Sequence, residues 1–289
     1  MSMPAHDQSP QITKIREHIG AEVTGIDLSQ PVDEETRQRL YDALVDNIAL
    51  VIRDQNFTAA QFQAAGELFG ELMEDQNRRY LAPGVPMVSI LSNHHKDSQG
   101  KQAKVANSAT WHTDHTNQAL PPKFTSLYPV ALPDRGGGTA LCNMRAAYEA
   151  LPDDLRQRID GMQTANTLIS SARTDTANPD IVQDQQEADG GPMIHPLVRT
   201  HPERGTKAIW FHQGKTERIL DMEPGETQEF LAALLEVAMR PEFTYTHEYR
   251  LGDMLILDNR SAMHKAGFDY DHSQHRMLYR LLVRGERPF

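Results

Sequence analysis

The chain has 289 residues, of which 39% are hydrophobic and 24% charged, a composition that suits a soluble globular protein and excludes wholesale disorder. Its 40 acidic residues outnumber 29 Lys and Arg and give a formal charge of -11, which repels phosphate backbones and argues against nucleic acid as a partner. No apolar run approaches the roughly 20 residues that span a bilayer, the first residues carry no hydrophobic leader, and Cys142 is the single cysteine. We therefore expect a cytoplasmic protein that does not bind a membrane.

The first third of the chain predicts a small sheet with helices. Residues Ile19–Arg53 are typical of a strand, a helix and a second strand, and the helix begins near Asp33. Thr58 and Gln61 have the spacing of a capping box and predict the start of a second helix, because each side chain can bond the other's backbone N–H. We expect this second helix to cover one face of a sheet.

From Met87 onward the pattern changes to short apolar runs between Pro, Gly and Asp, which is typical of strands. The predicted strands are Met87–Leu91, Phe124–Leu132, Thr139–Cys142, Lys207–Phe211, Glu242–Tyr249, Met254–Leu257 and Met277–Val283. Helices are predicted at Met144–Ile159, with a break at Pro152, and at Glu226–Met239. This order favours one mainly β domain over residues 1–289, with covering helices on a double-sheet jelly roll.

Residues 171–192 form a polar, acidic segment rich in turn-forming residues. Such a segment is either a disordered surface loop or a mobile lid over an active site. Composition does not decide between these two interpretations.

The tetrapeptide Trp111–Asp114 carries a candidate metal-binding pair. In a strand, His112 and Asp114 would point to the same face, so an imidazole and a carboxylate could meet at one metal. A centre of two His and one carboxylate needs a third ligand from a distant strand and leaves three positions open. His264 is a candidate, but spacing alone does not select it among 13 histidines, and the pair itself could be structural.

Two arginines near the C-terminus, Arg276 and Arg280, lie at i and i+4 and would share one face of a strand. They could be surface residues of an edge strand. Alternatively, each guanidinium could grip a carboxylate at the mouth of a barrel.

Taken together, these motifs resemble the Fe(II)/2-oxoglutarate dioxygenases of the taurine dioxygenase and 2,4-dichlorophenoxyacetate dioxygenase type. The resemblance extends from Ile19 to Phe289 and keeps the motifs in the family's order. The motifs are Gly20–Leu28, Phe69–Leu72, Trp111–Asp114, Gly136–Thr139, His195–Pro202, Asp258–Arg260, His264 and the paired arginines.

The resemblance implies a role for each matching residue. His112, Asp114 and His264 match the iron ligands, whereas Thr139 and Arg276 match the residues that bind the distal carboxylate of 2-oxoglutarate. It further implies a double-stranded β-helix that binds Fe(II) as its cofactor and consumes 2-oxoglutarate and O₂ as co-substrates. The expected reaction hydroxylates a small carboxylate or sulfonate, or cleaves it by way of hydroxylation, and releases succinate and CO₂. Members of the family commonly form homodimers or tetramers.

The segments that should border the substrate depart from the pattern of taurine-acting relatives. Taurine-acting relatives carry a histidine and an aromatic residue for the substrate directly after the motif matching Phe69–Leu72, where this chain has the run Met73–Tyr80, so taurine itself is not the expected substrate. Arg280 matches an arginine that binds the acid group of anionic substrates or lies beside it. The other candidate substrate contacts are His115, Asn117, Trp210, His212 and Lys215.

Two other functions use the same residues. A zinc hydrolase could hold its metal with two His and one Asp, but it would also need a general base and has no use for Thr139 with Arg276. A non-catalytic jelly-roll module could bind a small acid without turning it over.

Overall fold

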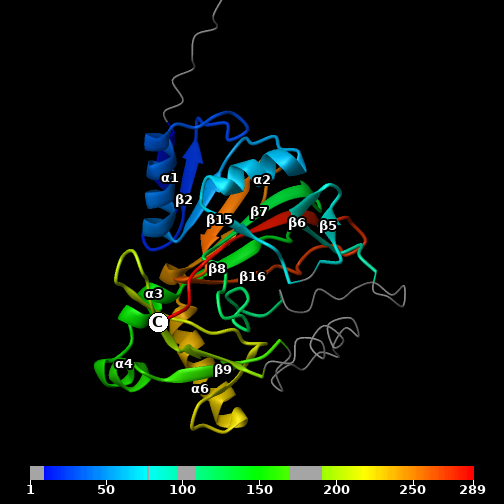
Figure 1. Cartoon of the computed structure of the whole chain (residues 1–289). Helices are drawn as coiled ribbons and strands as arrows, with labels where there is room; N and C mark the ends of the chain where they lie inside the picture. The colour runs from blue at the N-terminus through cyan, green and yellow to red at the C-terminus, as the bar shows by residue number, and fades with distance from the viewer. Residues whose placement is uncertain (1–9, 77, 97–108, 169–190) are drawn as a thin grey trace, which may run out of the picture.

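The computed structural model describes residues 10–76, 78–96, 109–168 and 191–289 (Figure 1). The segment 171–192 falls outside these residues except for its last two positions, so its role as a lid or a disordered loop stays a prediction. Among the described residues, no helix is long and apolar enough to cross a membrane.

The largest sheet has nine strands in the order β1-β2-β3-β15-β7-β17-β6-β5, with β4 paired to β17. The strands are β1 (Gln11–Lys14), β2 (Ala21–Thr24), β3 (Ala49–Ile52), β4 (Leu72–Met73), β5 (Leu81–Ala82), β6 (Val85–Ser92), β7 (Phe124–Ala131), β15 (Met254–Asp258) and β17 (Met277–Val283). The pair β2–β3 is parallel, and the other pairs are antiparallel. Because β17 lies between β7 and β6, it is not an edge strand, and the surface-arginine interpretation of Arg276 and Arg280 is wrong.

A second sheet of three strands packs against one face of the first, which gives the two layers of a jelly roll. Its order is β14-β8-β16, with β8 (Thr139–Asn143) between β14 (Thr244–His247) and β16 (Ala262–Ala266). Leu141 of β8 packs in one buried cluster with Leu127, Leu255 and Leu278 of the large sheet. This apolar layer lies between the two sheets and holds them together.

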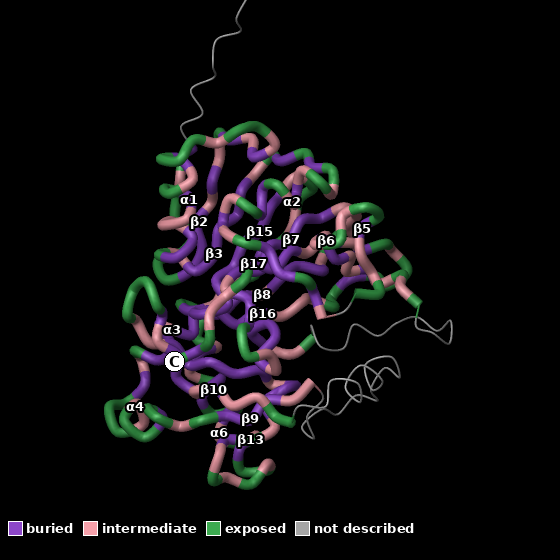
Figure 2. The backbone as a smooth tube through the Cα atoms, viewed as in Figure 1, coloured by how far each residue is buried: buried purple, intermediate pink, exposed green. Residues whose placement is uncertain are grey.

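Two helices cover the outer face of the large sheet (Figure 1), and this position was predicted for the second of them. Helix α1 (Glu34–Asn47) is capped by Asp33, and α2 (Ala59–Glu67) begins with the predicted capping box of Thr58 and Gln61. Gly66 brings α2 close to β17, since a Cβ there would lie 2.5 Å from a methyl carbon of Leu281. Figure 2 shows the buried strands beneath these helices.

The rest of the chain packs against the outer face of the small sheet around a separate apolar cluster. The helices here are α3 (Met144–Glu149), α4 (Asp153–Ile159) and α6 (Pro224–Ala238), with a 3₁₀ turn at Pro241–Phe243. Two further small sheets are β10-β9-β13 and β11-β12, built from β9 (Gln163–Asn166), β10 (Met193–Pro196), β11 (Val198–Thr200), β12 (Lys207–Ile209) and β13 (Thr216–Ile219). Cys142 of β8 and Met263 of β16 reach this cluster because alternate residues of a strand face opposite sides.

Candidate metal centre

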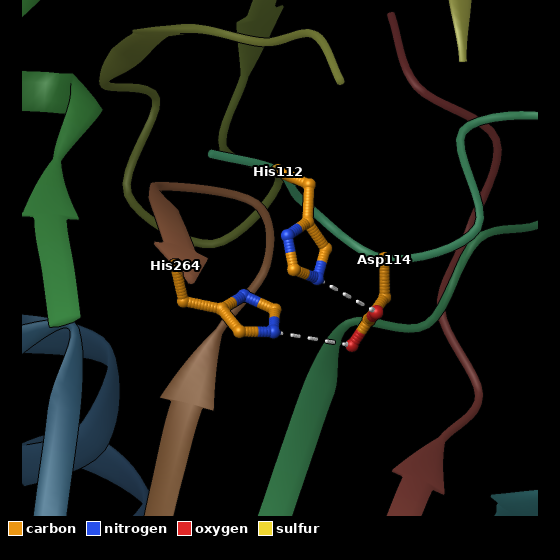
Figure 3. A group of neighbouring side chains, drawn as sticks. All are labelled: His112, Asp114 and His264. Carbon is orange, nitrogen blue, oxygen red and sulfur yellow. Dashed lines mark ion pairs between the residues drawn. The ribbon is translucent and has the colours of Figure 1, made fainter. Parts of the chain in front are cut away.

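His112, Asp114 and His264 come together although they belong to distant parts of the sequence (Figure 3). His264 lies on β16, and His112 pairs with it through two backbone hydrogen bonds: His112 N to His264 O at 3.0 Å and His264 N to His112 O at 2.7 Å. The expectation that His112 and Asp114 share one strand is wrong. His112 forms two isolated bridges, to His264 and His212, and Asp114 begins a turn. The turn rather than strand alternation therefore brings the carboxylate to the imidazoles.

The three side chains have the geometry of a metal site. One ligand atom from each lies within 4.8 Å of the others, and all three residues are buried. The Nε2 atoms of His112 and His264 lie 3.8 and 3.9 Å from the two carboxylate oxygens of Asp114. His112 Nδ1 lies 2.7 Å from the carbonyl oxygen of Thr110. A carbonyl only accepts, so Nδ1 carries the proton and Nε2 is left with a free lone pair for a metal.

The electrostatics of the site favour the protonation state that binds a cation. Burial lowers the pKa of His264 to about 3, and the charge of a protonated His112 adds to the effect. Burial also lowers the pKa of His112. Burial by itself would raise the pKa of Asp114, but the charge of protonated His264, of Arg280 and of protonated His112 holds it well below its usual range. At neutral pH the site therefore presents two neutral imidazoles and one carboxylate, which is the state a divalent cation requires.

Arg276 and Thr139 lie near each other, since Arg276 bonds Gly137, two residues before Thr139. Arg276 is buried and donates from Nε to the carbonyl oxygen of Gly137 at 2.7 Å, while its Nη2 has no hydrogen-bond partner within the described ranges. Thr139 Oγ1 bonds the hydroxyl of Tyr249 at 2.8 Å. A buried guanidinium nitrogen without a partner is costly unless an anion completes its bonding.

Tyr249 is a member of this group that sequence reasoning missed. Burial raises its pKa to about 12, so its hydroxyl keeps its proton at neutral pH and remains available as a donor. It follows β14 and thus lies beside β8, which carries Thr139. In the sequence, Tyr249 is simply the last residue of the predicted strand Glu242–Tyr249, and this position does not indicate a functional role.

Arg280 points toward the metal ligands, as its Nη1 lies 3.9 Å from Asp114 Oδ1. Its Nη2 forms an ion pair with the buried Asp75, a residue that sequence reasoning also missed. Ser89 and His115 complete the group, with Ser89 Oγ donating to Asp75 Oδ2 at 2.7 Å and His115 Nε2 at 3.7 Å from Asp75 Oδ1. The Nε of Arg280 is buried and has no partner among the residues that the structure describes.

The remaining predicted substrate contacts differ in their surroundings. Lys215 is buried and donates to Asn117 Oδ1 at 2.8 Å, and the ring of His212 lies 5.0 Å from that of His112. Trp210 is 1% exposed, and its Nε1 donates to the carbonyl oxygen of Asn259. Substrate contact at each of these residues stays a prediction.

The fold and the site together define a jelly-roll protein with a 2-His-1-carboxylate metal centre. The chain matches the family described as "Taurine catabolism dioxygenase TauD, TfdA family" over residues 11–282. It is 32% identical over 289 residues to an alkylsulfatase of Acinetobacter baylyi, with 96% of this chain and 86% of that protein covered. It is 30% identical over 269 residues to the alpha-ketoglutarate-dependent 2,4-dichlorophenoxyacetate dioxygenase of Cupriavidus pinatubonensis, covering 90% of this chain and 92% of that protein.

A solved structure agrees with these sequence relatives. The crystal structure of AAD-2 in complex with Mn(II) and N-oxalylglycine superposes with a TM-score of 0.80 at 27% identity, covering 97% of this chain and 99% of that one. The chain therefore belongs to the TauD/TfdA family and is a 2-oxoglutarate-dependent non-haem iron dioxygenase with Fe(II) as its metal and O₂ as co-substrate. This assignment confirms the resemblance and favours the dioxygenase over the zinc hydrolase and the non-catalytic module.

Proposed function

We propose that His112, Asp114 and His264 bind the iron, and that the enzyme oxidises a small organic anion. The donor set supports the metal assignment, because two neutral imidazoles and one carboxylate converge in a buried site. When bound, iron supplies the activation of O₂ that side chains cannot perform, with 2-oxoglutarate decarboxylated to succinate and CO₂. The protein residues hold the metal, orient the two substrates and exclude water.

We propose that Thr139 and Arg276 bind the distal carboxylate of 2-oxoglutarate. Arg276 Nη2 is buried without a partner in the described chain, and Nε is already held by Gly137 O, so the guanidinium is oriented before any ligand arrives. Such orientation lowers the entropy lost on binding. Tyr249 keeps the Thr139 hydroxyl in place on the same side.

The primary substrate carries an acid group that lies against Arg280. The observation that supports this most directly is the buried Nε of Arg280, which has no described partner and lies on a guanidinium 3.9 Å from the metal carboxylate. Among the relatives, one is named for alkyl sulfates and one for a phenoxyacetate. A sulfate ester or a carboxylate is therefore the expected substrate class.

A turnover screen tests this substrate class. Purified protein with Fe(II), 2-oxoglutarate and ascorbate is incubated with alkyl sulfates, aryloxyalkanoates and their uncharged ester or alcohol analogues, and succinate is measured. We expect succinate above background with an anionic compound and none with its uncharged analogue. Equal succinate from both members of a pair would contradict an anionic substrate.

The proposal also covers the domain organisation, the cellular compartment and the oligomeric state. The chain is one dioxygenase domain over 1–289, works in the cytoplasm and forms a homodimer or tetramer. The single cysteine, Cys142, is buried and free, which suits a reducing compartment. Light scattering of the purified protein measures the oligomeric state directly, and a monomeric mass would contradict that part.

A further inference from the structure

The metal carboxylate of Asp114 is held by a hydroxyl that the family's ligand set does not include. Thr125 Oγ1 lies 2.5 Å from Asp114 Oδ2, and both residues are buried. Thr125 belongs to β7, the strand next to β15 in the large sheet. The donor therefore comes from a rigid central strand rather than from the loop that carries the ligand.

The neighbouring Asn259 determines which way this hydroxyl points. Asn259 Nδ2 donates to Thr125 Oγ1 at 2.8 Å. A hydroxyl has one hydrogen, so when Oγ1 accepts from Asn259, its own hydrogen is directed to Asp114. The amide orientation is consistent, since Asn259 Oδ1 faces the backbone N–H of Asp114 at 3.4 Å.

The backbone N–H and the backbone carbonyl of Asn259 are both hydrogen-bonded, which fixes the position of this residue. Its N–H donates to the carbonyl oxygen of Lys123 at 2.8 Å, and its carbonyl oxygen accepts from Thr113 Oγ1 at 2.7 Å and from Trp210 Nε1 at 3.0 Å. It is 1% exposed. Asn259 thus connects the end of β15, the segment before β7 and the turn that carries Asp114.

This arrangement treats the two oxygens of Asp114 differently. Oδ2 accepts a hydrogen bond from Thr125 and lies 3.9 Å from His264 Nε2. Oδ1 lies 3.8 Å from His112 Nε2 and 3.9 Å from Arg280 Nη1, and it accepts no hydrogen bond from Thr125. A 2-His-1-carboxylate centre needs three open positions. A carboxylate that bound through both oxygens would occupy one of them.

We propose that Thr125, oriented by Asn259, is a positioning residue that retains Asp114 Oδ2 and leaves Oδ1 as the single oxygen for the metal. The inference rests on the iron site proposed above. Hydrogen-bond partners of metal ligands typically contribute about 10- to 100-fold to metal affinity. The Thr125 hydroxyl is expected to contribute on that scale and to preserve the position that 2-oxoglutarate uses.

Three variants separate the hydroxyl from its surroundings. Thr125→Val removes the hydroxyl but keeps the shape, and Thr125→Ser keeps the hydroxyl. Ser126→Ala is the matched control, because Ser126 is the next residue of β7 and its buried Oγ has no partner among the described residues. The measurements are anaerobic Fe(II) titration against a chromogenic chelator, and the visible absorption that appears when 2-oxoglutarate is added to the Fe(II) protein.

Thr125→Val is expected to bind Fe(II) about 10- to 100-fold more weakly and to give an altered absorption band. Thr125→Ser and Ser126→Ala should stay close to the unmodified protein in both measurements. Wild-type affinity and an unchanged band in Thr125→Val would overturn the inference, and so would a serine variant as weak as the valine variant. Should Thr125→Val fail to fold by circular dichroism, Thr125→Cys replaces it, and its weaker S–H donor should give an intermediate loss.

The same experiment distinguishes this inference from the proposed function. If the unmodified protein binds neither Fe(II) nor 2-oxoglutarate, both the proposed iron site and the proposed role of Thr125 are contradicted. If the unmodified protein binds both and the valine variant is indistinguishable from it, only the role of Thr125 is overturned.

Discussion

Arg276 bonds through Nε to the carbonyl oxygen of Gly137, and the same glycine leaves no room for a side chain against that guanidinium. A Cβ on Gly137 would lie 3.0 Å from both Cδ and Nε of Arg276, and the backbone φ is +70°. Gly137, in the glycine run before Thr139, therefore helps to hold the Arg276 side chain in place.

Gly137→Ala should move Arg276 and weaken the binding of 2-oxoglutarate. We expect its KM for 2-oxoglutarate to rise about tenfold, equivalent to about 1.4 kcal/mol, with Fe(II) affinity unchanged. Gly161→Ala is the matched control, because Gly161 also has a positive φ, +87°, but nothing lies within 4 Å of its added Cβ. An equal rise in both variants would show that backbone strain, not displacement of Arg276, is responsible.

Arg276 and Arg280 should have separable effects on the two substrates. Arg276→Gln should raise the KM for 2-oxoglutarate on the order of 100-fold, since it removes a charged hydrogen bond worth about 2–3 kcal/mol. Arg280→Gln should mainly raise the KM for the anionic primary substrate and change the KM for 2-oxoglutarate much less. Steady-state kinetics with each substrate varied in turn tests both, and the reverse pattern would mean that the two roles are exchanged.

His115 should make the metal-free protein less stable as pH falls. Burial lowers its pKa to about 4, despite the nearby carboxylate of Asp75, whereas an unfolded histidine titrates near 6.5. Between these values the unfolded chain binds more protons, so stability declines from pH 7 to pH 5 by about 2 kcal/mol at this residue. Urea unfolding of His115→Gln should show a decline smaller by about that amount.

The exposed His272→Gln is the control for this pH effect and should follow the unmodified protein. An identical decline in His115→Gln and in the unmodified protein would mean that His115 is already protonated in the folded state at pH 5. The metal must be removed with a chelator before each titration, because bound metal would add its own pH dependence.

The parts of the fold that the sequence predicts are those with strong local patterns. The capping box at Thr58, the helix beginning after Asp33 and the apolar run of β15 all carry local signals, and each forms as expected. Strand β16, which carries His264, was not predicted. Its residues Ala262–Ala266 lack a clear alternation of apolar and polar side chains, so only the family resemblance selected His264.

The residues that support the site were harder to find, because their roles depend on contacts between strands far apart in sequence. Asp75 pairs with Arg280 across 205 positions, and Asn259 reaches Thr125 across 134. Thr125 did leave a signal, as a threonine within the apolar strand Phe124–Leu132. A buried hydroxyl in such a strand needs a partner, but the sequence does not say that the partner is Asp114.

We expect His112, Asp114 and His264 to hold an iron to which 2-oxoglutarate binds. Anaerobic addition of Fe(II) and 2-oxoglutarate to the unmodified protein should produce a weak visible charge-transfer absorption. His264→Ala should abolish it, and Arg276→Gln should require a much higher 2-oxoglutarate concentration to reach it. An unmodified protein that shows no absorption and binds no 2-oxoglutarate would contradict the account.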